Sequence, residues 1–204
     1  MCEAKIAYHR AMAEVPVDIS EQEMVAMALE NKEFFGQIVA QYESKLGRYI
    51  ERLGVRNAED KEDVLQEIFI KVYKNLNGFD TSLKFSSWIY RIAHNEAISW
   101  FRKKNVRPEG HLVSSGDDIL ALVAAKQDGA EEDFDKDINA EVVIASLEKI
   151  DEKYRDPLIL RFFEHKEYEE ISDILKIPVG SVGTLIHRGK QQLRKQIDEE
   201  HIRL

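Results

Sequence analysis

The sequence predicts an all-α protein of two small helical domains joined by an acidic linker. Apolar residues recur with helical spacing over most of the 204 residues, and no segment sustains the apolar-polar alternation of a strand. A third observation separates the domains: residues 109–141 carry ten acidic side chains against two lysines, together with Ser-Ser-Gly and Asp-Gly turn signals. We expect an N-terminal extension (1–18), a first domain (19–107), an acidic linker (108–138) and a second domain (139–204).

The first domain is expected to hold three helical segments. Ser20 and Glu23 form a capping box, after which helical apolar spacing continues to Tyr42. Four acids between residues 59 and 63 favour the start of a second segment. Asn77-Gly78 ends that segment, and a third runs from about residue 85 to residue 104, stopping before Pro108.

The second domain is expected to end in a helix-turn-helix. Apolar positions between 142 and 163 predict two short helices, with Pro157 in the first turn of the second. Two further helices, 168–175 and 179–196, flank a turn at 176–178, and Ser181 is the expected cap of the last helix. The side chains expected to face inward are Ile171, Ile174 and Leu175 from the first of this pair, and Val182, Leu185 or Ile186, and Leu193 from the second.

Charge is distributed unevenly along the chain. A net charge of −9 argues against DNA binding, because lysine and arginine supply most non-specific affinity for phosphate. Yet residues 84–107 hold six basic side chains and one acid, and residues 181–195 hold four basic side chains and no acid. These two basic islands are the candidate DNA-binding surfaces, and we expect the free chain to bind DNA poorly because acidic segments accompany them.

Both basic islands lie on predicted helices whose residue patterns suit DNA binding. In the last helix the basic residues occupy the later turns, where they can reach phosphates while the N-terminal residues enter the major groove; a purely structural three-helix unit is the alternative. On the helix from residue 85, Trp88, Arg91 and Asn95 share one sector. A tryptophan among such side chains suits stacking on an unpaired base, worth roughly 1–3 kcal/mol. The alternative is that Trp88 packs on a neighbouring helix.

An acidic polar strip lies on the preceding helix. Asp63, Gln66 and Glu67 share one face, opposite the apolar stripe, because they are spaced three and four residues apart. The spacing alone leaves two interpretations open, a docking surface for a partner or a solvated helix face.

Other function classes are disfavoured. No apolar run approaches the roughly 20 residues that a membrane span needs, and the N-terminus lacks the pattern of a secretory signal. Cys2 is the only cysteine, which is typical of a cytoplasmic protein. The six histidines show no metal-ligand spacing and no phosphate-cradling glycine loop occurs. We therefore expect no catalysis, cofactor, metal or small-molecule substrate.

Three segments, in this order, resemble the bacterial extracytoplasmic-function (ECF) sigma factors of RNA polymerase. Residues 62–69 (EDVLQEIF) resemble the family's region 2.2, and residues 85–98 (FSSWIYRIAHNEAI) resemble regions 2.3 and 2.4. Residues 147–194 resemble region 4. The resemblance implies that the domains are sigma regions 2 and 4 and that the chain directs core polymerase to promoters.

The resemblance also implies site roles. The residues that would dock on the coiled-coil clamp of the polymerase are Asp63, Gln66, Glu67 and Phe69. Those that would bind the −10 element are Asn75, Phe79, Asp80, Trp88, Arg91, Asn95, Arg102 and Lys103. Those that would bind the −35 element are Ser181, Thr184, Leu185, His187, Arg188, Lys190 and Arg194. Further implied partners are the polymerase flap and an anti-sigma factor.

Some positions depart from the family pattern. Gly183 stands where arginine or lysine is common, so one base contact of the −35 reader is missing. Arg91 and Ile92 stand where housekeeping factors carry paired tryptophans. The competing hypothesis is a stand-alone helix-turn-helix regulator with a ligand-sensing first domain, which accounts for residues 147–196 but leaves the pattern at 62–104 unexplained.

Overall fold

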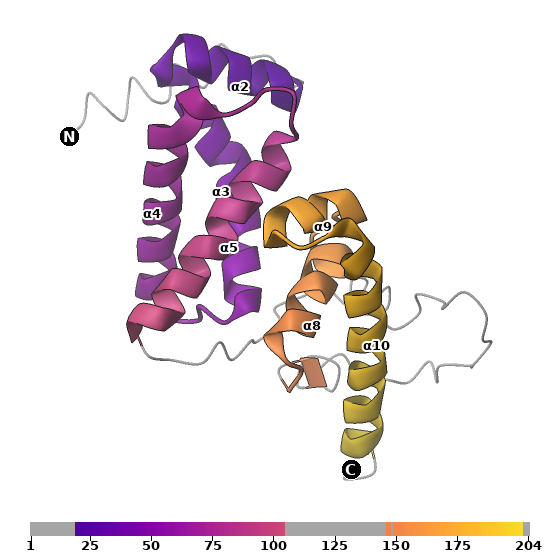
Figure 1. The fold of residues 1–204 in the computed structure, drawn as a ribbon. Helices are drawn as coiled ribbons and strands as arrows, with labels where there is room; N and C mark the ends of the chain where they lie inside the picture. Colours follow the sequence, from indigo (N-terminus) through magenta and orange to yellow (C-terminus); the bar gives the residue numbers. More distant parts are fainter. Residues whose placement is uncertain (1–18, 105–145, 148, 202–204) are drawn as a thin grey trace.

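The computed structural model describes residues 19–104, 146–147 and 149–201, and within these residues every regular element is a helix. The all-α prediction is therefore confirmed. The helices form two units that lie side by side, an N-terminal domain (residues 19–104) and a C-terminal domain (residues 146–201) (Figure 1). The predicted extension and acidic linker fall outside the described residues.

Four α-helices build the N-terminal domain. Helices α3, α4 and α5 pack as a bundle, and α2 lies across one end of it (Figure 1). Their bounds are α2 Glu21–Glu30, α3 Phe35–Leu53, α4 Ala58–Asn75 and α5 Phe85–Lys104, with 3-10 turns at Lys32–Phe34 and Leu76–Gly78. The third predicted segment therefore coincides with α5.

The first predicted segment begins as expected but is broken in two. The Ser20 hydroxyl accepts the Glu23 N–H at 3.2 Å and the Glu23 carboxylate accepts the Ser20 N–H at 2.9 Å, which confirms the capping box. The break occurs at Asn31, which adopts an extended conformation (φ −136°, ψ 116°). Its side-chain oxygen accepts the Glu33 N–H at 3.0 Å, a local bond that competes with helix continuation.

The start of α4 depends on Asn57, which was not predicted as a helix cap from the sequence. The Asn57 side chain accepts the N–H groups of Glu59 and Asp60, at 2.8 and 3.3 Å, and so caps the helix. The preceding helix, α3, ends at Gly54 with φ 120°, a conformation that a residue with a side chain rarely adopts.

The C-terminal domain contains the predicted helix-turn-helix. Its elements are α8 Glu152–Leu158, a π-helical turn Ile159–Phe163, α9 Tyr168–Leu175 and α10 Val179–His201. The turn between α9 and α10 passes through Lys176 in the left-handed region (φ 55°). Inside this domain Ile186, rather than Leu185, is the buried residue of the pair left open by the sequence.

Two sequence-based predictions for this domain were wrong. Pro157 is the sixth residue of α8 rather than part of a first turn, because the Asp151 side chain caps the helix earlier, accepting the Lys153 N–H at 3.0 Å. Ser181 does not cap α10, since the helix already begins at Val179. The Ser181 N–H instead donates to the Pro178 carbonyl at 2.8 Å.

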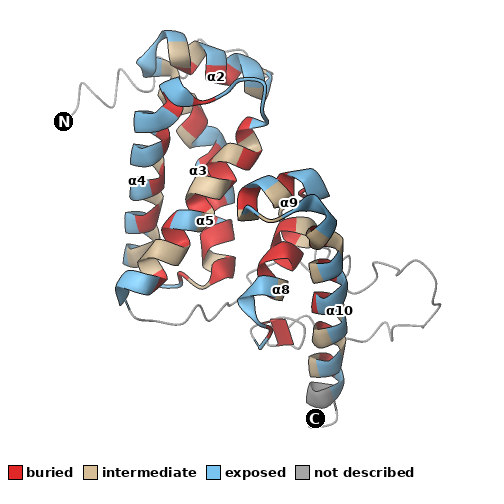
Figure 2. Ribbon diagram, in the orientation of Figure 1, coloured by how far each residue is buried: buried red, intermediate tan, exposed pale blue. Residues whose placement is uncertain are grey.

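Each domain buries its own apolar face, and the two domains also touch. Figure 2 shows the buried residues turned toward the helix interfaces and the exposed residues turned outward. Fully buried leucines and isoleucines occupy both interiors, among them Leu46, Ile50, Ile68 and Ile89 in the first and Leu158, Ile159 and Ile171 in the second. Helix α9 packs directly against α5, which joins the domains in one compact arrangement (Figure 1).

Candidate functional site

The outer face of α4 combines acidic and apolar side chains. Asp63, Gln66 and Glu67 are all exposed on it, opposite the buried stripe of Val64, Ile68 and Val72, and Phe69 is partly buried. The same helix also exposes Ile70 and Tyr73, at 43% and 42%. The sequence analysis did not predict a role for Ile70 and Tyr73. The signal that could have identified them is that both are large apolar residues outside the apolar stripe of this helix.

Tyr73 is held in place although it is exposed. Its ring meets the edge of Phe35 with 5.1 Å between centroids, and the Lys32 ammonium lies 5.1 Å from its centroid. An aromatic side chain that is already ordered loses little conformational entropy when a partner covers it. Together Asp63, Gln66 and the two exposed apolar side chains form a surface suited to docking.

Trp88 belongs to an aromatic cluster at the start of α5. Its centroid lies 5.1 Å from that of Phe79 and 5.5 Å from that of Phe85, and these two are 5.4 Å apart. Trp88 remains partly exposed, so it both packs on its neighbours and presents part of its surface to solvent. Phe79, a predicted DNA contact, is only 9% exposed because the cluster buries its ring, and the structure therefore assigns it to the core.

The loop between α4 and α5 is ordered by local hydrogen bonds. Asp80 is exposed, and its side chain accepts the Ser82 N–H at 2.9 Å. Hydrogen bonding by the Ser82 side chain, together with this N–H, lowers the pKa of Asp80. The Asn75 amide donates to the Lys71 carbonyl at 2.8 Å. Asn75 is therefore the last residue of α4, whereas Asp80 lies in the loop, directly after Phe79 of the aromatic cluster.

The first basic island forms a polar surface along α5. Arg91 is partly exposed, and Asn95, Arg102 and Lys103 are exposed. The one acid of this island, Glu96, is nearly buried and pairs with Lys71 of α4. Lys71 therefore neutralises the charge of Glu96. The surface of α5 is for this reason more favourable for binding nucleic acid than the sequence alone indicates.

The recognition helix α10 presents a polar face to solvent. Thr184, His187 and Arg188 are exposed, and Ser181, Leu185, Lys190 and Arg194 are partly exposed. The His187 ring lies 3.1 Å from the Gln191 amide nitrogen. Lys190 differs from the others, since its ammonium lies 4.9 Å from the centroid of Phe162 and burial lowers its pKa.

Among the described residues, no helix is long and apolar enough to cross a membrane. Within the same residues, no three His, Cys, Asp or Glu side chains are grouped as a metal site would require.

Comparisons with known proteins match both domains. The family model "Sigma-70 region 2" matches residues 38–107, and the model "Sigma-70, region 4" matches residues 140–193. The ECF RNA polymerase sigma factor SigW of Bacillus subtilis is 34% identical over 172 residues, covering 82% of this chain and 90% of that protein. The ECF sigma-E factor of Haemophilus influenzae is 30% identical over 176 residues, covering 82% and 89%.

Two solved structures share the fold. CnrH, in complex with the cytosolic domain of CnrY, gives a TM-score of 0.64 at 23% identity, covering 88% of this chain and 97% of that one. The sigma factor RpoE of Bartonella quintana, in complex with the anti-sigma factor NepR, gives a TM-score of 0.57 at 16% identity, covering 80% and 96%.

Proposed function

The chain belongs to the ECF sigma factors of the sigma-70 family, and from this premise we propose which of its surfaces performs each step of initiation. As a sigma factor it binds core RNA polymerase and directs promoter recognition and transcription initiation. In the proposal α4 docks on the polymerase, α5 and the loop before it bind the −10 element, and α10 binds the −35 element.

The observation that carries the proposal is the partly exposed Trp88, which shares one sector of α5 with Arg91 and Asn95. A base that leaves the duplex loses a few kcal/mol of stacking and pairing. Stacking on an aromatic side chain returns roughly 1–3 kcal/mol, and the exposed Arg102 and Lys103 supply phosphate contacts farther along α5. Stacking on Trp88 and the phosphate contacts of α5 can therefore offset the cost of holding an unpaired strand.

The exposed face of α4 supports the docking role. Asp63 and Glu67 provide charge complementarity to a basic surface such as the clamp coiled coil, and Ile70 and Tyr73 provide apolar area at its side. This assigns the acidic strip to a partner rather than to solvent.

The C-terminal domain would read the −35 element through the exposed Thr184, His187 and Arg188 while docking on the polymerase flap. An anti-sigma factor is the proposed regulatory partner, since both solved structures above are complexes and the second contains an anti-sigma factor. The proposal places the protein in the bacterial cytoplasm and gives it no catalytic activity of its own.

Reconstituted transcription tests the assignment. With core polymerase and a cognate promoter, Trp88→Ala should reduce run-off product roughly tenfold, the loss of about 1.4 kcal/mol of stacking. Trp88→Phe keeps an aromatic surface in the cluster and should retain most activity. Both variants should co-elute with core polymerase like the wild type.

Two outcomes would contradict the proposal. If Trp88→Ala also abolished co-elution, Trp88 would itself take part in docking, and the separation of clamp docking on α4 from −10 binding on α5 would be wrong. If the wild-type chain failed to co-elute with core polymerase but still bound DNA, the chain would act as a stand-alone helix-turn-helix regulator.

A further inference from the structure

The contact between the two domains is built from charged and polar side chains as well as apolar ones. Two carboxylates of the C-terminal domain, Glu164 and Glu170, are each held by a cation and a hydroxyl of the N-terminal domain. We propose that these two glutamates form a latch that keeps α9 on α5 in the free chain and that must open before both promoter elements are bound together.

Glu164 occupies the more deeply buried half of the latch. Its carboxylate pairs with Arg52 of α3, and the two side chains are only 6% and 5% exposed. The Tyr90 hydroxyl of α5 donates to the same carboxylate at 2.6 Å. Arg52 also lies over the Phe163 ring, 5.1 Å from its centroid, so its guanidinium contacts two side chains of the other domain.

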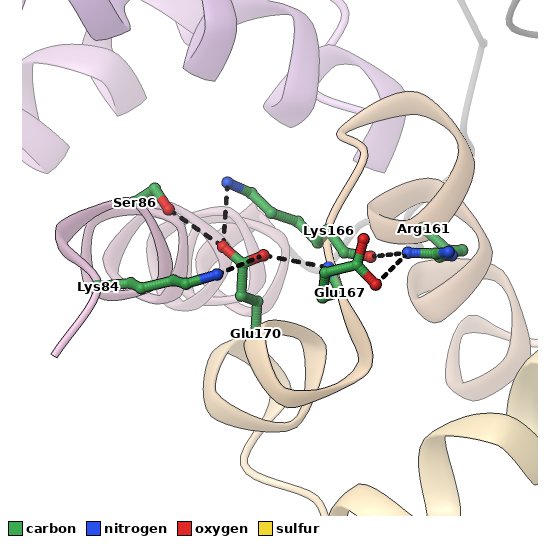
Figure 3. Close-up of polar contacts among 6 residues, drawn as sticks. All are labelled: Lys84, Ser86, Arg161, Lys166, Glu167 and Glu170. Atoms are coloured by element: carbon green, nitrogen blue, oxygen red, sulfur yellow. Dashed lines mark hydrogen bonds and ion pairs between the residues drawn. The ribbon is translucent and has the colours of Figure 1, made fainter. Parts of the chain in front are cut away.

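Glu170 occupies the second half, at the start of α5 (Figure 3). The Ser86 hydroxyl donates to its carboxylate at 3.2 Å, and the Lys84 ammonium lies 3.4 Å away. Its other contacts come from its own domain, the Glu167 N–H at 3.1 Å and the Lys166 ammonium at 3.9 Å. Lys166 in turn lies 4.3 Å from the centroid of Tyr90, which links the two halves.

The two halves differ in strength. Lys84 is 65% exposed, so its pair with Glu170 is weak and screened by salt. The pair of Arg52 and Glu164 is desolvated, so salt screens it little, and opening the latch returns both charges to water together. Removing one charge alone leaves the other buried without compensation, which strongly destabilises the closed state.

The latched arrangement is incompatible with reading both promoter elements. Helix α5 packs on α9 and α9 packs on α10, so at 8–10 Å per helix pair α5 and α10 lie within roughly 20 Å. The −10 and −35 elements are about 25 base pairs apart, on the order of 85 Å of B-DNA at about 3.4 Å per pair. The closed chain can engage either element singly and forgoes the gain in affinity from engaging both.

This consequence rests on the proposed roles of α5 and α10, whereas the latch itself does not. It also differs from repulsion by the acidic linker, because it depends on four identified partners in the N-terminal domain. A distance measurement in the free chain therefore tests the latch independently of transcription.

The experiment uses the full chain with Cys2→Ser and nitroxide labels on Ser44→Cys of α3 and Asp198→Cys of α10, both at exposed positions. Pulsed electron-spin resonance should give one short distance for the wild-type background. Glu164→Gln should raise the ratio of open to closed chains at least roughly tenfold. Glu170→Gln should raise it less, and its difference from the wild-type background should become smaller at high salt, which screens the exposed Lys84.

Glu169→Gln is the matched control, because it removes the same charge from an exposed position on α9, the helix that carries Glu170. It should leave the distance unchanged, and circular dichroism should show equal helix content in all variants. The latch is refuted if Glu164→Gln and Glu169→Gln give the same distribution, or if the wild-type background is already open. A failure of the promoter assignments would appear in run-off transcription and leave these distances unaffected.

Discussion

Helix α10 crosses α8 at Gly189, and the closeness of this crossing can be tested by adding a single methyl group. A Cβ at Gly189 would lie 2.9 Å from Cδ1 and 3.1 Å from Cγ of Leu158, and 3.0 Å from the Tyr154 carbonyl oxygen. Leu158 is fully buried and the carbonyl belongs to the α8 backbone, so neither can move aside alone. Gly189→Ala therefore forces α8 and α10 apart.

The expected magnitude follows from two opposing effects. Overpacking of this kind costs about 1–3 kcal/mol, and contacts near 3.0 Å with immobile atoms place it in the upper part of that range. Alanine in a helix interior returns about 0.8–1.0 kcal/mol relative to glycine. The net expectation is a loss of about 1–2 kcal/mol in the free energy of unfolding of the C-terminal domain.

Gly180→Ala provides the control on the same helix. No atom lies within 4 Å of the Cβ it would add, so only the helix propensity changes and stability should rise by up to about 1 kcal/mol. Hydrogen exchange of the α10 amides measures both effects locally. Protection should fall roughly fivefold to thirtyfold in Gly189→Ala and should not fall in Gly180→Ala. Equal or greater protection in Gly189→Ala would refute the close packing of α8 and α10.

Two further predictions concern a backbone conformation and a titrating side chain. Lys176 adopts φ 55°, a conformation that glycine adopts at lower cost. Lys176→Gly should therefore raise the free energy of unfolding of the C-terminal domain by about 1 kcal/mol and so raise its thermal midpoint. An unchanged or lower midpoint would contradict this. Burial lowers the pKa of His94, whose Nδ1 lies 3.1 Å from the Tyr49 hydroxyl oxygen, so the folded state binds fewer protons than the unfolded state below about pH 6.5. The urea midpoint should therefore be steady above about pH 7 and fall as the pH drops below about 6.5, and His94→Gln should flatten this dependence.

The His94 prediction has a clear failing result. Carboxylates also protonate as the pH falls, but their ordinary pKa values near 4 place that effect below about pH 5. If His94→Gln and the wild type lost stability in parallel between about pH 5.5 and 6.5, His94 would not be the group responsible.

The sequence by itself determined the helical class and most helix positions. Apolar spacing and the capping box at Ser20 placed the first helix, and α5 runs over the predicted residues. These features are local, because a cap or an amphipathic stripe depends on residues three or four apart. The family resemblance, which the comparisons confirm, rests on the same local segments.

Other features were decided by the tertiary structure. The sequence could not show that Phe79 is enclosed by Phe85 and Trp88, nor that Glu96 turns toward Lys71, because these contacts join different elements. The contact of Glu164 with Arg52 spans 112 residues of chain. No periodicity encodes a pairing at that range. The pair forms because the packing of the two domains removes both charges from water, and a buried charge is stable only with its partner.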